Sequence, residues 1–376
     1  MEEQIKVKTV LMRGGSSKAV FLDARDVPKD EAALSRFLLA IFGSPDKRQI
    51  DGLGGSDYLT SKCAIMGPPT RPDADIDYNF VQVAVESPIV SYDINCGNIS
   101  SAAGVYAIEE GYVKPQGEMT IVRVHNTNTG KILRMKIPTK GGRPQVEGDF
   151  AIDGVPGTGA EIAMDFSATA GAASGRLLPT GNVKDRIELE TIGKSVDVSI
   201  VDVANMCVFV AGESMGMTGA ERPNTVPVKL LDALEELRGK AYARCGINAP
   251  SYLLPFQVVV GGPQEYENFL HPEPVPADSM DVTARLYVDR TMHKAYAGTG
   301  ATCLAVAAQI PGTVVNEVAR KERQGNQVRI GHPSGTLPIV ANVSPAADGW
   351  KVDEVLFSRT ARRLMEGQAY IRRARL

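Results

Sequence analysis

Histidine is scarce in this sequence, and cysteine lacks the spacing of a metal site or a disulfide framework. Four His occur in 376 residues, none in an HxH or HExxH motif, and the five Cys include no CxxC pair. A phosphate-binding GxxxxGK[ST] loop is also missing. We therefore expect neither a metal nor an organic cofactor. An odd number of widely spaced cysteines is typical of reduced thiols, which predicts a cytoplasmic protein.

The sequence also lacks a dominant charge sign and long apolar runs. Its 41 basic and 44 acidic residues leave a net charge of −3 and are spread along the chain. This distribution argues against nucleic acid or an anionic membrane as a partner. No apolar run approaches the roughly 20 residues that span a bilayer, and the charged start, MEEQIKVKTV, lacks the pattern of a secretory signal. We therefore expect no nucleic acid and no membrane among the partners.

The residues that are present suffice for two domains. At 43% hydrophobic residues, the chain can bury two cores of ordinary size. Residues 30–42 place apolar side chains on one helical face and end before Gly43, which suits a C-terminal cap. The strands expected in the first half are residues 5–12, 19–22, 63–66, 78–84, 121–125 and 132–137. This half therefore predicts an α+β fold with a predominantly antiparallel sheet.

Small residues fill the stretch 148–175, a composition typical of an exposed loop or of a crossing between domains. We place the boundary near residues 175–182. This gives an N-terminal domain of residues 1–180 and a C-terminal domain of residues 181–376, with the last strand free to return to the first domain. In the second half we expect strands at 195–203, 208–211 and 257–260 and a helix at 228–242.

Two segments of the chain are similar to each other. Residues 96–107, CGNISSAAGVYA, resemble residues 297–308, AGTGATCLAVAA. Each follows an extended segment and opens a small-residue helix. Because the match is short, the residues alone leave a duplicated domain and a chance similarity equally open.

Cys96 lies where the first of these helices is expected to begin. Gly97 and Asn98 allow a tight turn, and the Ala- and Ser-rich run after them favours a buried helix. The free backbone N–H groups and the positive end of the helix dipole would favour a thiolate, and they would also bind a substrate carboxylate. The alternative is a small buried cysteine at a helix cap. The residues favour an acid/base thiol, with Gly97 and Asn98 as binding residues.

Lys62 follows a glycine-rich lead-in and precedes a short apolar strand. It could hold a carboxylate or stabilise a nearby thiolate, whereas a solvated surface lysine is the commoner alternative. The turn RGGSSK at 13–18 could bind an anion through its backbone N–H groups and the hydroxyls of Ser16 and Ser17. It could equally be a plain hairpin turn.

The second small-residue helix offers another N-terminus for an anion, at Gly298, Thr299 and Gly300. His293 precedes this helix and is either a polar contact to a ligand or a structural hydrogen-bonding residue. Asn205 stands between two expected strands, where it could donate to a ligand or satisfy a turn.

Six segments together resemble the PrpF and methylitaconate isomerase family. They are RGGSSK at 13–18, GLGGSDYLTSK at 52–62, CGN at 96–98, LLPTGN at 177–182, DVANMCVFV at 202–210 and HKAYAGTGA at 293–301. They run in order through nearly the full length. The resemblance implies a diaminopimelate-epimerase-like fold, in which two topologically similar α/β domains each wrap around a central helix and the active site lies in the cleft between them. It also accounts for the internal similarity.

In the epimerases of that fold a cysteine begins each central helix, but here Cys96 is matched by Ala297. A two-base epimerase needs an acid opposite its base, so this chain departs from that chemistry. One thiolate can instead take a proton from one carbon of an allylic system and return it two bonds away. The resemblance implies that Cys96 carries the proton and that Lys62 binds a carboxylate and stabilises the developing charge. It implies that Ser17 and His293 are polar contacts and that no cofactor is required.

The resemblance thus implies a 1,3-proton shift that moves a C=C bond in a small unsaturated di- or tricarboxylate. It favours (R)-3-methylitaconate, converted to 2,3-dimethylmaleate, with 2-methylaconitate or 4-oxalomesaconate as the alternative substrate. A non-catalytic accessory protein of an aconitase-like enzyme is an alternative of another class. An amino-acid epimerase is a third, which Ala297 argues against. We expect a homo-oligomer, dimer or tetramer, because cleft enzymes of this size commonly assemble.

Overall fold

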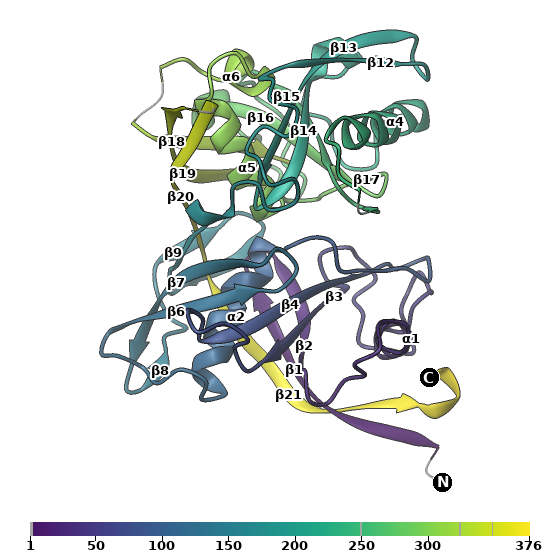
Figure 1. Ribbon diagram of the computed structural model, residues 1–376, viewed down its shortest axis with the longest axis vertical. Coiled ribbons are helices and arrows are strands. Elements are labelled where there is room, and N and C mark those ends of the chain that lie inside the picture. Colours follow the sequence, from purple (N-terminus) through teal and green to yellow (C-terminus); the bar gives the residue numbers. More distant parts are fainter. Residues whose placement is uncertain (1–2, 249, 323–324, 348) are drawn as a thin grey trace. The chain divides into compact units, whose positions relative to one another are not determined.

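The computed structural model describes residues 3–248, 250–322, 325–347 and 349–376. The chain divides into two compact units (Figure 1). The first contains residues 3–152, 157–164 and 359–376, and the second contains residues 153–156 and 165–358. The last strand of the chain is therefore part of the first unit.

Residues 165–180 lie in the second unit, whereas the boundary drawn from the sequence placed them in the first. Backbone hydrogen bonds explain this position. Gly171 donates to the carbonyl of Asp202 at 2.8 Å, and the N–H of Asp202 donates to the carbonyl of Leu177 at 2.9 Å. These bonds join residues far apart in the sequence, so composition alone does not locate the boundary.

A mixed sheet forms most of the first unit. Its strand order is β21–β1–β2–β3–β4–β6–β7, in which β2–β3 and β4–β6 are parallel pairs and the other neighbours are antiparallel. The expected α+β fold with a predominantly antiparallel sheet is confirmed. The strands of this unit are β1 (Gln4–Gly14), β2 (Ser17–Asp23), β3 (Lys62–Gly67), β4 (Ile76–Val83), β5 (Val90–Ser91), β6 (Met119–Asn126), β7 (Lys131–Lys140), β8 (Arg143–Pro144) and β21 (Ala361–Arg372).

Helix α2 (Gly97–Glu109) is the central helix of the first unit, and the sheet wraps around it (Figure 1). It is buried along nearly its whole length, as expected for a helix of small and apolar residues. Gly104 allows the helix to lie close to β7, because a Cβ at this position would be only 2.6 Å from Ile137 Cδ1. Strands β6 and β7 alternate buried and exposed residues, which is typical of strands with one face on a core.

Helix α1 (Glu31–Phe42) covers the outer side of the sheet in the first unit. Asp30 is its N-cap and accepts from the backbone N–H of Ala33 at 2.8 Å, and Gly43 ends it in the left-handed conformation. Phe37, Leu38 and Ile41 are buried in a core cluster together with apolar residues of β1, β2, β3, β4 and β21. The helix predicted at 30–42 with its glycine cap is confirmed.

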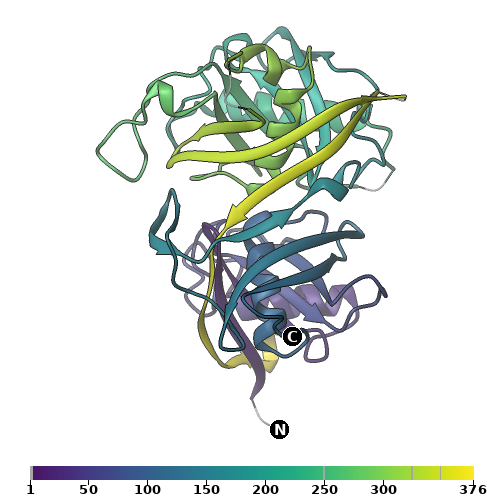
Figure 2. The ribbon, with the colours of Figure 1, turned by 90° about the vertical axis from the view of Figure 1, so that its left-hand side faces the viewer.

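The second unit has its own mixed sheet, in the order β12–β13–β14–β15–β16–β18–β19–β20, with parallel pairs β14–β15 and β16–β18. Figure 2 shows the long strands β19 and β20 side by side. The strands are β12 (Asp185–Leu189), β13 (Lys194–Val203), β14 (Asn205–Ala211), β15 (Phe256–Gly261), β16 (Val282–Val288), β17 (Thr291–Met292), β18 (Gln327–His332), β19 (Gly335–Ala346) and β20 (Gly349–Arg359). The helices are α3 (Gly212–Met215), α4 (Val228–Arg244), α5 (Gly298–Gln309) and α6 (Val314–Val318).

Both units have the same topology. From β21 to β7 and from β12 to β19, neighbouring strands are antiparallel, antiparallel, parallel, antiparallel, parallel and antiparallel in turn. Helices α1 and α4 occur at the same place in this succession, and so do the buried helices α2 and α5. The two topologically similar domains are thus confirmed, and a duplicated domain explains the internal similarity.

The expectation of an exposed loop over residues 148–175 is wrong for part of that stretch. It contains β9 (Phe150–Ile152), β10 (Val155–Gly159), β11 (Ile162–Asp165) and a short 3₁₀ turn, η1 (Ser167–Thr169). Ile162, Met164 and Phe166 occur at every second position and are all buried. The many Gly and Ala residues around them conceal this short alternation.

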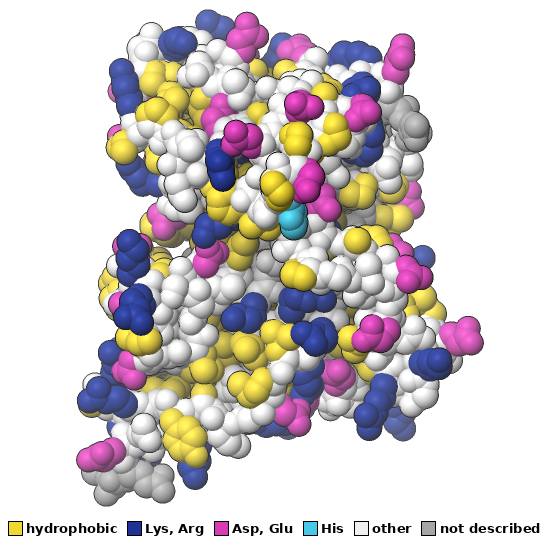
Figure 3. Space-filling view, turned by 180° about the vertical axis from the view of Figure 1, so that it is seen from behind, with side chains coloured by type: hydrophobic (Ala, Val, Ile, Leu, Met, Phe, Trp, Pro, Cys, Tyr) yellow, Lys and Arg dark blue, Asp and Glu magenta, His cyan; other side chains and the backbone are white. Residues whose placement is uncertain are grey.

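On the face drawn in Figure 3, Lys and Arg side chains are interspersed with Asp and Glu side chains. Within the described ranges, no helix is both long and apolar enough to cross a membrane. The absence of nucleic acid among the partners stays a prediction.

Candidate active site

Cys96 is the N-cap residue of α2, with an extended backbone at φ −119° and ψ 101°. Its side chain makes no capping hydrogen bond, and its carbonyl accepts both the backbone N–H and the hydroxyl of Ser100, at 2.8 and 2.9 Å. The first turn of the helix contains no acidic residue. The thiol therefore lies beside the first N–H groups of the helix, at the positive end of its dipole.

The other cysteines have different surroundings. Cys63, Cys207 and Cys303 are buried, and burial raises the pKa of the Cys63 and Cys207 thiols. Cys303 donates to a backbone carbonyl of β13 at 3.2 Å. Cys245 is half-buried like Cys96, but its thiol donates to a carbonyl of its own helix and burial raises its pKa to about 11. Cys96 is thus the cysteine whose position best suits proton transfer.

The segment before Cys96 is anchored by side-chain amides. Asn95 Oδ1 accepts a hydroxyl from the first turn of α2 at 3.2 Å and accepts from Asn126 Nδ2 at 3.1 Å. Asn128 Nδ2 donates to carbonyls of β4 and of the loop before α2, at 2.8 Å each. The turn at 127–130, which joins β6 to β7, therefore also fixes where α2 begins.

Lys62 is the first residue of β3 and is only 3% exposed, so the alternative of a solvated surface lysine is wrong. Its Nζ donates to Gln82 Oε1 at 2.6 Å. The same nitrogen lies 4.4 Å from the ring centroid of Tyr58 and 5.2 Å from that of Phe80. Both ring faces attract the cation, and the amide oxygen accepts one of its three hydrogens.

The electrostatics connect Lys62 with Cys96. Burial lowers the pKa of Lys62, whereas negative charge at Cys96 and Asp57 raises it. An ammonium at Lys62 and a thiolate at Cys96 therefore stabilise each other. Burial also raises the pKa of Tyr78, and the charge of Cys96 raises it further, so this tyrosine stays protonated.

The glycine-rich lead-in to β3 folds around the side chain of Gln49. Gln49 Nε2 donates to Ser61 Oγ at 2.8 Å, and its Oε1 accepts the backbone N–H of Ser56 at 2.8 Å. A Cβ on Gly54 would overlap the Gln49 amide, so glycine is needed for close approach. This packing sets the path of the chain up to Lys62 and explains the glycines without a bound ligand.

The turn between β1 and β2 packs against the first turn of α2. A Cβ on Gly15, whose φ is +50°, would overlap Asn98 Oδ1. Asn98 Nδ2 donates to Ser16 Oγ at 3.2 Å, and Arg359 Nε donates to Asn98 Oδ1 at 2.8 Å. Ser17 Oγ is buried and has no hydrogen-bond partner in the part of the chain that is described. A buried hydroxyl of this kind is a candidate for binding a ligand.

The start of α5 is the counterpart of this region in the second unit. Ala297 is the N-cap there, as Cys96 is for α2. Asn205 begins β14 just as Ser17 begins the corresponding strand β2. Asn205 Nδ2 donates to Thr299 Oγ1 at 2.9 Å, which brings these two predicted residues together.

Other predicted residues of the second unit make packing or hydrogen-bond contacts within that unit. A Cβ on Gly298 would overlap the ring of Phe357, and one on Gly300 would overlap the side chain of Leu286. Close packing is thus sufficient to explain both glycines. His293 is buried, and its Nδ1 accepts the backbone N–H of Ala295 at 3.2 Å.

Sequence reasoning missed Gln82 and Arg359. Gln82 had a detectable signal: it continues the inward face of β4 after Tyr78 and Phe80, where a polar residue interrupts an apolar alternation. Arg359 stands in FSRTARR, where nothing local distinguishes it from Arg362 and Arg363.

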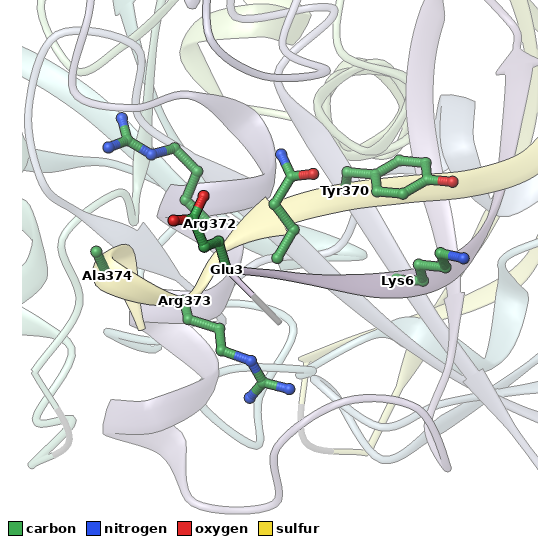
Figure 4. A pocket seen from close by; sticks show the side chains of 7 residues that line it. Glu3, Lys6, Tyr370, Arg372, Arg373 and Ala374 are labelled. Atoms are coloured by element: carbon green, nitrogen blue, oxygen red, sulfur yellow. The ribbon is translucent and has the colours of Figure 1, made fainter. Parts of the chain in front are cut away.

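A hollow of about 910 Å³ lies at the ends of β1 and β21 and contains none of the predicted site residues. Figure 4 shows the side chains that line it, which are Glu3, Gln4, Lys6, Tyr370, Arg372, Arg373 and Ala374. They are residues at the end of a two-stranded ribbon, without a buried acid/base group. No group of three or more His, Cys, Asp or Glu residues within the described ranges could hold a metal ion.

Comparison with known proteins gives full-length matches. The profile described as PrpF protein matches residues 4–372. The chain is 47% identical to the 3-methylitaconate isomerase of Eubacterium barkeri, with all of both chains covered. It is 37% identical to the (4E)-oxalomesaconate Delta-isomerase of Novosphingobium sp. (strain KA1), over 96% of each chain. It is 35% identical to the 2-methyl-aconitate isomerase of Cupriavidus necator, over 97% of this chain and 96% of the relative.

Solved structures match over similar lengths. A methylitaconate-delta-isomerase matches with a TM-score of 0.79 and 46% identity, over 100% of this chain and 97% of that one. A hydroxyproline epimerase from Agrobacterium vitis has the same fold, with a TM-score of 0.60 and 11% identity over 98% of this chain and 93% of that one. The family profile and the full-length relatives agree, and the chain belongs to the PrpF protein family.

Proposed function

We propose that this chain is an isomerase that moves a C=C bond of a small unsaturated di- or tricarboxylate by a 1,3-proton shift, with Cys96 as the proton carrier. One observation carries the proposal. A half-buried thiol begins α2 with buried Lys62 close enough to be affected by its charge, whereas Ala297 begins the corresponding helix α5. One thiol suits a proton that leaves and returns on one side of the substrate.

The proposed step is balanced in protons and electrons. The Cys96 thiolate removes a proton from the allylic carbon, and the electron pair left behind is delocalised over the C=C bond and the adjoining carboxylate. The thiol then returns the proton to the carbon two bonds away. The thiolate is regenerated and the substrate is neither oxidised nor reduced, so we propose that the reaction is cofactor-independent.

Lys62 has the proposed role of binding a substrate carboxylate and stabilising the charge that develops on it. A fixed ammonium in a site shielded from water stabilises such a charge far better than a solvated one does. The rings of Tyr58 and Phe80 provide this shielding, since they lie against Nζ. Lys62 would act without exchanging protons with the substrate.

The proposed binding residues fall into two groups. In the first unit, Asn98 and Ser16 are hydrogen-bonded to each other, and the nearby Ser17 has an unpartnered buried hydroxyl. In the second unit, Asn205 and Thr299 are hydrogen-bonded at the start of α5. The full set that we propose to contact substrate is Ser16, Ser17, Gly97, Asn98, Asn205, His293, Gly298, Thr299 and Gly300.

For the substrate we propose (R)-3-methylitaconate, converted to 2,3-dimethylmaleate. The 47% identity to the 3-methylitaconate isomerase of Eubacterium barkeri supports this choice over 2-methylaconitate and 4-oxalomesaconate, whose isomerases are 35% and 37% identical to this chain.

We also propose a cytoplasmic location, because the five cysteines are free thiols. A homo-oligomer is proposed as well, and light scattering of the purified protein tests it.

The function is tested by incubating the protein with 3-methylitaconate, 2-methylaconitate and 4-oxalomesaconate and following the alkene absorbance. We expect the fastest turnover with 3-methylitaconate. In deuterated water the product should carry deuterium at the carbon that receives the proton, unless the thiol returns the same proton before exchange. Failure of all three substrates to react would refute the proposed isomerase.

Variants of two half-buried cysteines identify the proton carrier. Cys96→Ser and Cys96→Ala should lose turnover almost completely while keeping the wild-type circular dichroism spectrum. Cys245→Ser is the matched control, because Cys245 is also half-buried but lies at the end of α4, and this variant should keep full activity. An accessory protein of another enzyme would keep its effect in both Cys96 variants.

A further inference from the structure

Gln82 lies directly opposite Lys62 in the sheet. The two residues are Cα partners in the antiparallel pair β3–β4, so their side chains leave the same face of the sheet. Gln82 is 3% exposed, and its Oε1 accepts from Lys62 Nζ at 2.6 Å. This is the short distance of a hydrogen bond in which one partner carries a charge.

The amide of Gln82 is fixed in one orientation. Its Nε2 donates to the carbonyl of Ser61 at 2.9 Å and to that of Tyr58 at 3.2 Å, which occupies both of its hydrogens. Because an amide nitrogen cannot face two carbonyls and a cation at once, the oxygen must point to Lys62. The acceptor is therefore set by the backbone before β3 and does not depend on the protonation state of Lys62.

Gln82 is also a neutral acceptor. Among the described residues, no acidic side chain lies within ion-pair distance of Lys62 Nζ, although the charge of Asp57 is felt there. The titratable groups that face the ammonium are Cys96 at the start of α2 and Asp57 and Tyr58 in the loop before β3. The amide satisfies one hydrogen of the ammonium without neutralising its positive charge.

We propose that Gln82 is a positioning residue for Lys62, which holds the ammonium in place and protonated while keeping its full charge available to the carboxylates of the substrate. The inference rests on the proposed role of Lys62 in binding a carboxylate. A carboxylate at position 82 would hold the ammonium as firmly but would compete with the substrate for it. An apolar side chain at position 82 would leave the buried ammonium with fewer partners.

Two variants change these properties separately. In Gln82→Met the acceptor is lost, so the neutral form of Lys62 becomes easier to reach. That hydrogen bond favours the charged form, so the pKa of Lys62 should fall when it is lost. In Gln82→Glu an isosteric negative charge pairs with the ammonium. The pKa of Lys62 then rises, and KM for a dicarboxylate should rise about tenfold or more.

Asn79→Asp is the matched control. Asn79 is in the same strand and undergoes the same amide-to-carboxylate change, but it lies on the opposite face of β4, where its Nδ2 donates to Thr127 Oγ1 at 2.8 Å. We expect this variant to have wild-type KM, kcat and pH profile.

The experiment has two readouts. Steady-state kinetics with methylitaconate across pH should show the alkaline limb moving down in Gln82→Met and up in Gln82→Glu, with the increase in KM larger in the latter. Separately, the rate at which an amine-acylating reagent modifies Lys62, followed by peptide mass spectrometry, gives the pKa of Lys62 without any turnover. This second readout still tests Gln82 if the protein converts none of the proposed substrates.

The proposal is overturned if Lys62 titrates in both Gln82 variants as it does in Asn79→Asp. It is also overturned if Gln82→Glu leaves KM at the wild-type value. Should Gln82→Met fail to fold, the isosteric Gln82→Glu decides the question alone, because its predicted shifts in pKa and KM have a definite sign.

Discussion

The guanidinium of Arg359 donates from Nε to Asn98 Oδ1 at 2.8 Å, although 261 positions separate the two residues in the sequence. This bond decides which end of the Asn98 amide faces Ser16, because the oxygen is taken and Nδ2 must point to the hydroxyl. Arg359 is 4% exposed, so the hydrogen bond is made away from bulk water. Asn98, two positions after the proposed catalytic Cys96, is thus held by Arg359, which begins the last segment of the first unit.

We predict that Arg359→Met raises KM about tenfold, because the amide of Asn98 loses the group that orients it. Arg359→Lys should give a smaller increase, since an ammonium can reach the oxygen but cannot reproduce the planar donor. Initial-rate kinetics measure both effects. Arg372→Met, at an exposed position near the end of β21, is the control and should leave KM unchanged. An unchanged KM in Arg359→Met would refute the orienting role.

For Ser17→Ala we predict opposite effects on stability and activity. The Ser17 hydroxyl is buried without a partner among the described residues, so its removal should leave the free energy of unfolding unchanged or raise it by up to about 1 kcal/mol. KM should rise, because Ser17 is proposed to contact the substrate through this hydroxyl. The control is Ser199→Ala, whose hydroxyl donates to the carbonyl of Val183 and accepts the N–H of Val314. Urea unfolding should show that this variant loses about 1–3 kcal/mol, and its KM should stay at the wild-type value.

Lys62→Met should lower kcat and raise Tm, and the increase in Tm should depend on pH. Burial lowers the pKa of Lys62 below its ordinary value of 10.5. Protonated Lys62 therefore opposes folding at neutral pH, and this opposition fades as pH rises from the folded-state pKa to 10.5, where the unfolded state also loses the proton. We predict that Lys62→Met has a higher Tm than wild type at pH 7 and that the difference narrows towards pH 10. Its kcat should fall about 100- to 1000-fold. A Tm difference independent of pH would contradict this explanation.

Two glycine-to-alanine changes in helices should have opposite signs. In Gly298→Ala the new methyl group meets the ring of Phe357, so the start of α5 must shift, at a cost of about 1–3 kcal/mol. Gly239 lies in α4 with no atom within 4 Å of an added Cβ. Gly239→Ala should therefore stabilise the protein by up to about 1 kcal/mol. Thermal unfolding of the two variants beside wild type distinguishes packing from helix propensity.

Local patterns in the sequence predicted a helix of the first unit and the start of the helix that carries the proposed proton carrier. The helix at 30–42 followed from its apolar spacing and Gly43, and the position of Cys96 followed from the small residues that open α2. Local patterns could not predict which residues distant in the sequence contact each site residue. The burial of Lys62 depends on Phe80 and Gln82, which are brought to it by the pairing of β3 with β4, and on Tyr58 in the loop before β3.

The errors have a similar origin. The boundary near residue 180 was placed by composition, but the pairing of Gly171 and Leu177 with β13 decides the unit to which they belong. The alternation in β11 is only a few residues long and is surrounded by Gly and Ala. For the glycines at the start of α5 the sequence indicated anion binding, which stays a prediction, and close packing against Phe357 and Leu286 is sufficient to require glycine there.

Because β1 pairs with β21, the unit that begins the sequence is the second to have all of its strands during synthesis. Gln4 pairs with Arg372 and Gly14 with Ala361, so β1 has only β2 as a neighbour until translation has passed residue 372. The second unit, by contrast, has all of its strands once β20 has been made. On the ribosome, Cys96 and Lys62 are synthesised early, yet the second unit is the first to be able to close its sheet.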